Sequence, residues 1–262
     1  MNGKSMMARM SVLSYGVICY AIFFATFLYA FGFVGNLFVP KSMDSPADGP
    51  LWQALLINLG LLAVFAVQHS VMARPAFKRW WTQYVRRPVE RSTYVLFSSL
   101  ALILLFWQWR PMGGVVWHME SQTARMIMHG IFVSGWMLVL VATFLINHFD
   151  LFGLRQVWLY FRGRKYTYLP FRTPGPYQHV RHPLYVGWLL AFWATPTMTV
   201  AHLLFAIMTA AYILMAIRWE ERDLATHHGR IYTEYRERVP MLVPSLKGVK
   251  MPETTVAQTV DA

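Results

Sequence analysis

The sequence predicts an all-α membrane protein: a polytopic helix bundle of five or six membrane segments that ends in a helical hairpin and carries a cytoplasmic cofactor site. Two observations predict this class. Of the 262 residues, 56% are hydrophobic and only 14% are charged, whereas a soluble domain carries about 25% charged residues. Basic residues also concentrate in every second segment between the long apolar runs. The composition excludes a disordered chain, a collagen-like repeat and an ordinary cytosolic enzyme.

Four apolar runs each predict one spanning helix. The first, Ser11–Gly35, has 25 residues without a charge. A signal-peptide core has only about 7–15 residues, so we expect a retained helix. A spanning helix needs roughly 20 apolar residues, and the other runs of about this length are Leu51–Ala73, Ser92–Trp109 and Ile127–Asn147.

The last apolar stretch, Leu184–Ile217, is too long for one span and predicts a hairpin. Thr195-Pro196-Thr197 interrupts it, and proline breaks a helix because it removes a backbone hydrogen bond. The apex is therefore expected near Pro196. The first arm is short for a full crossing.

The basic residues test this topology. The segments 1–10, 74–91, 155–181 and 218–250 hold 2, 6, 6 and 7 of the 24 Lys and Arg residues, which is 21 together. Lys and Arg accumulate in cytoplasmic loops. A hairpin keeps these four segments on one side, so we expect both termini and the active site to be cytoplasmic.

The chain is expected to form a single integral-membrane domain over residues 1–247, with a motif-bearing catalytic part at 172–244. The polar tail 248–262 is expected to be disordered. The single cysteine, Cys19, lies in an apolar run, so no intrachain disulfide can form and we expect a buried side chain. Oligomeric state is left open.

Polar residues inside the spans are candidate site residues because burying them is costly. For Asn58 and Ser70 we favour interhelical hydrogen bonds, and for His69 and His129 we favour packing over a site. His202, beside the hairpin apex, is expected to be interfacial. The sequence has no metal-ligand pattern and no P-loop, Rossmann or hydrolase motif. We expect the aromatic and basic segment 150–181 to lie at the membrane interface rather than to bind nucleic acid.

A dense cluster of motif residues lies where the hairpin begins. Pro183 suits the first position of a helix, which makes His182 the expected N-cap. The free N–H groups of such a helix end bind carboxylate or phosphate, and His182 and Tyr185 lie within reach of a ligand there. The cluster comprises Gly175, Pro176, Tyr177, Arg181, His182, Pro183, Leu184, Tyr185 and Gly187.

An acidic pair, Glu220 and Glu221, follows the hairpin at the same membrane face. These carboxylates would either pair with Arg218 and Arg222 or bind a sulfonium cofactor or ribose hydroxyls. The hairpin places this potential cation site beside the potential anion site at the helix end. One ligand that carries both charges would fit.

These residues resemble the membrane methyltransferases typified by isoprenylcysteine carboxyl methyltransferase. The family pattern is G-x-Y-x-x-x-R-H-P-x-Y-x-G, a hydrophobic hairpin, E-E-x-x-L, a glycine and Y-x-x-Y. It is matched in order and spacing by Gly175, Tyr177, Arg181, His182, Pro183, Tyr185, Gly187, Glu220, Glu221, Leu224, Gly229, Tyr232 and Tyr235. The stretches 147–156 and 169–175 look closest to a bacterial branch, the methanethiol S-methyltransferases, which convert methanethiol to dimethyl sulfide.

The resemblance implies S-adenosylmethionine as methyl donor, a small thiol as substrate and a location in the bacterial inner membrane. It implies donor contacts from Gln156, Leu169, Pro170, Phe171, Arg172, Tyr177, His182, Pro183, Leu184, Tyr185, Glu220 and Glu221. The prenylcysteine enzymes carry a substrate-contacting arginine four residues before their glutamate pair. This chain has Ala216 there, which favours a small thiol.

Three functions stay open: a thiol methyltransferase, a related enzyme acting on an isoprenylcysteine carboxylate or a lipid headgroup, and a non-enzymatic scaffold or transporter. In the first case the thiolate attacks, and an apolar pocket opposes its formation. We therefore expect His182 or Tyr185 to take the thiol proton, directly or through water, and Arg218 or Arg181 to stabilise the anion.

Overall fold

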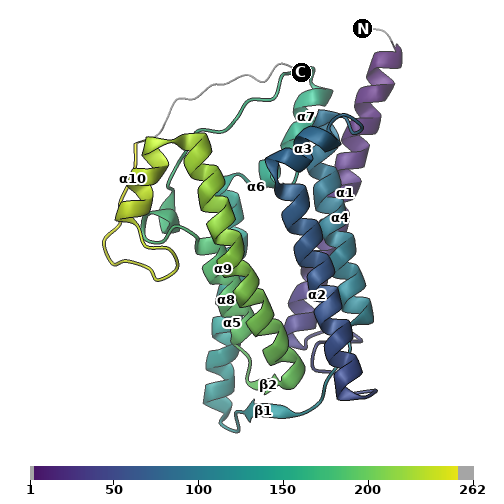
Figure 1. Ribbon diagram of the computed structural model, residues 1–262, viewed down its shortest axis with the longest axis vertical. Coiled ribbons are helices and arrows are strands. Elements are labelled where there is room, and N and C mark those ends of the chain that lie inside the picture. Colours follow the sequence, from purple (N-terminus) through teal and green to yellow (C-terminus); the bar gives the residue numbers. More distant parts are fainter. Residues whose placement is uncertain (1–2, 253–262) are drawn as a thin grey trace.

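The computed structural model describes residues 3–252 and is mainly helical, with two short strands, which confirms the all-α class (Figure 1). Within these residues, five helices are long and apolar enough to cross a membrane. They are α1 (Gly3–Gly35), α2 (Leu51–Ala73), α4 (Arg87–Gln108), α5 (Gln122–Ile146) and α9 (Val200–His228). The shorter elements are α3 (Pro75–Trp81), α6 (His148–Leu151), α7 (Leu154–Phe161), the 3-10 helix η1 (Gly175–Gln178), α8 (Pro183–Trp193), α10 (Arg230–Arg238), β1 (Val115–His118) and β2 (Thr197–Thr199).

The predicted hairpin is confirmed, with α8 and α9 as its arms and Pro196 at its apex. The 11 residues of α8 span about 16 Å, roughly half of a hydrocarbon core of about 30 Å. A strand follows the apex, which was not among the expected elements. In the structure β2 pairs antiparallel with β1, and the Met119 N–H donates to the Pro196 carbonyl at 2.9 Å. This ribbon ties the apex to the connection between α4 and α5.

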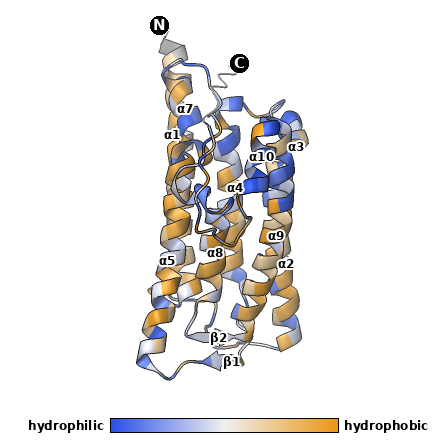
Figure 2. Cartoon of the chain, turned by 90° about the vertical axis from the view of Figure 1, so that its left-hand side faces the viewer, coloured by the Kyte–Doolittle hydropathy of each residue, from blue (hydrophilic) through white to orange (hydrophobic). Residues whose placement is uncertain are grey.

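All four basic segments lie at one end of the bundle. The start of α1 lies at this end together with α3, α7 and α10, whereas β1 and β2 lie at the other end (Figure 1). Figure 2 shows hydrophobic ribbon along the middle of the long helices and strongly hydrophilic ribbon around α3, α7 and α10. The fold therefore has the one-sided charge distribution that the hairpin topology predicts.

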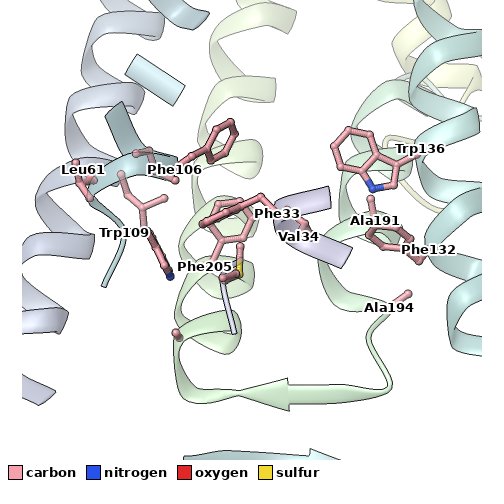
Figure 3. Close-up of a cluster of buried hydrophobic side chains, with 14 residues drawn as sticks. Phe33, Val34, Leu61, Phe106, Trp109, Phe132, Trp136, Ala191, Ala194 and Phe205 are labelled. Atoms are coloured by element: carbon pink, nitrogen blue, oxygen red, sulfur yellow. The ribbon is translucent and has the colours of Figure 1, made fainter. Parts of the chain in front are cut away.

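A cluster of buried apolar side chains joins the long helices near the β ribbon (Figure 3). Phe33 of α1, Leu105 of α4 and Trp109, which follows α4, are at most 1% exposed. Lipid tails are as apolar as leucine, so close packing rather than transfer from water stabilises such a core. Cys19 is 1% exposed, which confirms the expected burial.

Two glycines let α8 lie directly against α5. A Cβ atom on Gly187 would be 2.8 Å from the Gly135 carbonyl oxygen, and one on Gly135 would be 2.6 Å from the Ala191 nitrogen. Both distances are shorter than real Cβ contacts. Small residues allow this close backbone approach in membrane helices, which explains the glycine of the sequence motif at position 187.

His202 corrects one prediction, because it is 1% exposed rather than interfacial. Its Nδ1 lies 3.0 Å from Asp44 Oδ2, and its Nε2 lies 3.0 Å from the Phe192 carbonyl oxygen. Asp44 also accepts hydrogen bonds from Asn36 and Thr199. The loop after α1 is thereby tied to both arms of the hairpin.

The other polar residues inside the spans make the expected hydrogen bonds. The Ser70 hydroxyl of α2 lies 3.0 Å from the Tyr212 hydroxyl of α9. The Asn58 amide donates to the Arg110 carbonyl at 2.7 Å and accepts from its N–H at 2.8 Å. Both side chains connect segments far apart in the sequence.

The first residues of the tail expected at 248–262 pack against the rest of the chain. The Val249 N–H donates to the Gln178 carbonyl at 2.9 Å, and Met251 is 4% exposed. The chain as far as Pro252 therefore packs over the connection before α8. The rest of the predicted tail, residues 253–262, lies outside the described residues.

Candidate active site

The hairpin brings the start of α8 to the last turns of α9. Pro183 is the first helical residue and His182 the N-cap, as predicted, but the His182 side chain makes no capping hydrogen bond. Instead its Nε2 lies 3.0 Å from Glu221 Oε1 and its Nδ1 lies 3.9 Å from Glu220 Oε2. Because a carboxylate only accepts hydrogen bonds, Nε2 is the hydrogen-bond donor and Glu221 Oε1 is the acceptor.

Glu221 is the inner carboxylate of the pair. It accepts a hydrogen bond from Arg181 Nε at 2.7 Å, and the two side chains are 12% and 10% exposed. The pairing with Arg218 or Arg222 that the sequence allowed is therefore wrong for this carboxylate. Glu221 joins the two arms of the hairpin.

Arg181 also holds the chain after α10. Its Nη1 donates to the Arg236 carbonyl at 2.8 Å and to the Val239 carbonyl at 2.5 Å, and its backbone N–H donates to the Pro240 carbonyl at 2.9 Å. The guanidinium is thus occupied by the protein itself. This side chain positions the acid pair.

Glu220 is the accessible carboxylate, with 44% of its side chain exposed. It accepts a hydrogen bond from the Tyr185 hydroxyl at 2.9 Å. Tyr185 lies one turn into α8, so the first turn of that helix presents both His182 and Tyr185 to the acid pair. That these two side chains contact a ligand stays a prediction.

Aromatic residues border the acid pair on the side of α10. The Tyr235 hydroxyl donates to the Tyr177 carbonyl at 2.6 Å, and the Phe171 ring packs edge-on against Tyr232 and Tyr235. Phe171 brings the extended connection 162–174 onto α10. The predicted contact residues Leu169, Pro170 and Arg172 lie on this connection.

The Tyr232 hydroxyl is buried and has no hydrogen-bond partner within residues 3–252. Burial raises its pKa, and the Glu221 and Glu220 carboxylates raise it further. The hydroxyl therefore remains a donor at neutral pH. Burial and the Glu220 carboxylate likewise raise the pKa of Tyr177.

Two of the predicted site residues lie apart from this cluster. Gln156 is on α7, where its amide nitrogen donates to the Asp150 carbonyl at 3.1 Å and its buried amide oxygen has no partner within the described chain. Arg218 is exposed on α9 and lines an open surface hollow with Arg222, Arg236 and Glu221. Arg218 is thus near the acid pair but on its outer side.

Some residues near the site were not among the sequence candidates. Tyr232 belongs to the matched Y-x-x-Y pattern, and that pattern was the signal that could have found it.

Comparison with known proteins decides the family. The chain is 59% identical over 241 residues to the methanethiol S-methyltransferase of Crocosphaera subtropica, covering 92% of this chain and 94% of that protein. It is 51% identical over 238 residues to the methanethiol S-methyltransferase of Mycobacterium tuberculosis, covering 91% and 98%. The chain belongs to the methanethiol S-methyltransferase family.

A more distant relative supports the wider resemblance. Over 186 residues, 68% of this chain and 70% of the relative, the protein is 30% identical to nurim of Mus musculus. This relationship fits the isoprenylcysteine carboxyl methyltransferase-like group. No family model and no solved structure matches the chain.

Proposed function

We propose that the protein transfers the methyl group of S-adenosylmethionine to methanethiol and so forms dimethyl sulfide and S-adenosylhomocysteine. The observation that carries the proposal is an accessible carboxylate, Glu220, beside His182 and Tyr185. It occurs in a chain that is 59% identical to a methanethiol S-methyltransferase. Methyltransferase activity requires a methyl donor, and this site has groups suited to one.

The residues present fit S-adenosylmethionine. When bound, the cofactor supplies an electrophilic methyl group on a sulfonium cation. Glu220 offers a carboxylate to a cationic group, and the unpartnered Tyr232 hydroxyl offers a buried donor. The N–H groups at the start of α8 suit a ligand carboxylate. The site thus has partners for both charges.

We assign the donor contacts to three regions of the chain. The first turn of α8 contributes His182, Pro183, Leu184 and Tyr185, and the end of α9 contributes Glu220. The connection before α8 contributes Leu169–Arg172 and Tyr177. Gln156 of α7, which lies apart from these groups, is a further candidate contact. Glu221 and Arg181 position these groups through their ion pair. Holding the reactants in line lowers the barrier to methyl transfer.

The location follows from charge and solubility. The basic end of the bundle carries the acid pair, and the positive-inside rule supports our proposal that this end lies at the cytoplasmic face of a bacterial inner membrane. A small apolar thiol partitions into lipid and reaches the bundle laterally. Its sulfur must lose a proton before it attacks, and the candidates remain His182 or Tyr185 for the proton and Arg218 or Arg181 for stabilising the anion.

A prenylcysteine or lipid-headgroup substrate is not favoured. Relatives that are 45–59% identical to this chain all carry the name methanethiol S-methyltransferase. Ala216 also replaces the arginine expected for the prenyl substrate. If the protein were a purely structural scaffold, the groups of the site that suit a methyl donor would have no role.

Headspace analysis tests the proposal. Purified protein in lipid nanodiscs is mixed with S-adenosylmethionine and methanethiol, with a prenylcysteine analogue in parallel. We expect dimethyl sulfide and no methylated prenylcysteine. We expect Glu220→Gln to abolish the signal, whereas the control variant Glu234→Gln, whose ion-pair partner Arg230 is 92% exposed, should retain it. Methylation of the prenyl analogue alone would contradict the proposal.

A further inference from the structure

A hollow lies where the end of α9 meets α10, on the outer side of the acid pair. Its volume is about 570 Å³, within the range of about 300–1,000 Å³ that is typical of small-molecule sites. Of the described residues, His182, Tyr185 and Glu220 do not line it, so it is separate from the groups that we assign to the methyl donor. We call it the arginine hollow, and its lining residues are Arg218, Glu221, Arg222, Ala225, Thr226 and Arg236.

Three guanidinium groups dominate the charge of the arginine hollow. Arg218 and Arg222 are one turn apart on the same face of α9, and Arg236 lines the hollow from α10. Within residues 3–252, none of these three arginines forms an ion pair with a carboxylate. Glu221 also lines the hollow, but its charge is compensated by the ion pair with Arg181. The hollow therefore has an excess of positive charge, which suits an anion.

The position of the arginine hollow along α9 indicates which anion it meets. The helix begins at Val200, beside the β ribbon, and rises about 1.5 Å per residue. Arg218 and Arg222 therefore lie about 27 and 33 Å along the helix, where a hydrocarbon core of about 30 Å gives way to the headgroup layer. Figure 2 shows hydrophobic ribbon along α9 and hydrophilic ribbon around α10. Guanidinium groups at this depth meet lipid headgroups.

Aromatic residues mark the same level of the bundle. Trp219 lies next to Arg218 on α9, and the Arg74 guanidinium at the end of α2 lies 5.7 Å from the centre of the Trp219 ring. Trp80 of α3, at the same end of the bundle, is 50% exposed. Tryptophan is enriched where a membrane protein crosses the boundary between lipid and water. The arginine hollow thus lies at the membrane surface.

We propose that the arginine hollow binds the headgroup of an acidic phospholipid from the leaflet at the basic end of the bundle. Arginine presents a fork of N–H donors that matches phosphate oxygens, and anionic lipids attract basic residues near the membrane surface. Leu214 and Met215, about one turn before Arg218, are 44% and 42% exposed. They offer apolar contacts to an acyl chain of the same lipid.

Such a lipid would connect two helices. Its phosphate lies between arginines of α9 and an arginine of α10, so binding stabilises the contact between these helices. Any ligand that binds only the folded protein raises its melting temperature. The inference rests on the hollow and its charges and does not depend on the proposed function.

Two double variants with equal loss of charge test the inference. Arg222→Gln with Arg236→Gln removes two of the three guanidinium groups and keeps the Arg236 carbonyl, which accepts a hydrogen bond. Arg218 stays in place because it is a candidate for the reaction. The control is Arg79→Gln with Arg230→Gln, which removes two exposed arginines elsewhere at the same end of the bundle.

Each protein in maltoside detergent is titrated with phosphatidylglycerol, phosphatidylcholine or glycerol 3-phosphate. Native mass spectrometry counts the bound molecules, and melting temperatures are measured in parallel. We expect wild type and the control to bind phosphatidylglycerol in preference to the other two compounds and to melt at a higher temperature with it. The hollow variant should lose about tenfold or more of this affinity and should show no rise in melting temperature.

Other patterns overturn the inference. Equal affinity of all three proteins for phosphatidylglycerol would exclude the arginine hollow, and equal loss in both double variants would show general attraction to a basic surface. Glycerol 3-phosphate bound as tightly as phosphatidylglycerol would assign the hollow to a soluble phosphate compound. If the hollow variant does not fold, Arg222→Lys with Arg236→Lys keeps the charge and should still prefer phosphatidylglycerol to phosphatidylcholine. Loss of that preference in the folded lysine variant would contradict the site.

Discussion

Arg181 and Glu221 connect the two arms of the C-terminal hairpin through an ion pair in which Arg181 Nε and Glu221 Oε1 are 2.7 Å apart. Both side chains are about nine-tenths buried. Arg181 also donates to the carbonyls of Arg236 and Val239. One guanidinium therefore fixes the start of α8, the end of α9 and the end of α10 relative to one another.

Replacing this arginine should unfold the site. Arg181→Met leaves the Glu221 carboxylate buried without its main partner and two carbonyls without donors. Breaking a buried pair costs about 3–5 kcal/mol, so we expect a large fall in melting temperature in detergent and loss of activity. Arg230→Ala is the control, because its ion pair with Glu234 leaves the arginine 92% exposed and should change stability by about 0.5 kcal/mol or less. Similar melting temperatures for the two variants would contradict this assignment.

Gly187 should not tolerate a side chain. Its Cβ would meet the Gly135 carbonyl at 2.8 Å, and overpacking of this kind costs about 1–3 kcal/mol. Gly187→Ala should lower the melting temperature and displace α8, which reduces activity. Gly130→Ala on α5 has nothing within 4 Å of the new Cβ and should be neutral or stabilising. Thermal unfolding and activity assays compare them, and a stable, active Gly187→Ala would refute the close packing.

Substitutions at Tyr232 and Tyr235 should have different effects, the first on ligand binding and the second on stability. The Tyr232 hydroxyl has no partner in the described chain, so Tyr232→Phe should leave the melting temperature of the free protein near wild type. It should weaken S-adenosylhomocysteine binding about tenfold, the value of one hydrogen bond. Tyr235→Phe loses a bond to the Tyr177 carbonyl and should lower the melting temperature instead. Unchanged ligand affinity in Tyr232→Phe would remove Tyr232 from the donor site.

Acid should destabilise the opposite end of the bundle through Asp44. Burial raises the pKa of this carboxyl, but its hydrogen bonds to His202, Asn36 and Thr199 and the His202 charge outweigh burial, so the pKa is lowered. A lowered pKa stabilises the fold above the ordinary carboxyl pKa of about 4, and this contribution is lost as pH falls below it. Asp44→Asn should flatten the pH dependence of the melting temperature in that range. Asp48→Asn, from an exposed ion pair with Arg110, should keep the wild-type profile; equal profiles for all three proteins would contradict the role of Asp44.

The sequence predicted the features that depend on local composition. Uncharged length located the four spans, Pro196 located the hairpin apex, and the one-sided basic segments predicted that both arms of the hairpin start and end at the same face. The motif then placed His182 and Pro183 at the start of a helix. Each of these inferences uses the composition of segments along the chain and needs no knowledge of which distant side chains are in contact.

What the sequence did not predict depends on contacts between distant segments. His202 looks interfacial from its position, but Asp44 reaches it from a loop 158 residues away. Glu221 has two arginines nearby on its own helix, yet Arg181 on the other arm is its partner. Helical spacing says which residues share an end of the bundle. It does not say which of them touch.

The central claim is that Glu220, held beside His182 and Tyr185, binds the cationic methyl donor. Calorimetric titration of S-adenosylmethionine into wild type, Glu220→Gln and the control variant Glu234→Gln on α10 tests it directly. We expect wild type and Glu234→Gln to bind alike and Glu220→Gln to bind at least about tenfold more weakly, since a charge-assisted contact is worth about 1.5–3 kcal/mol. Equal affinity for all three proteins would contradict the claim.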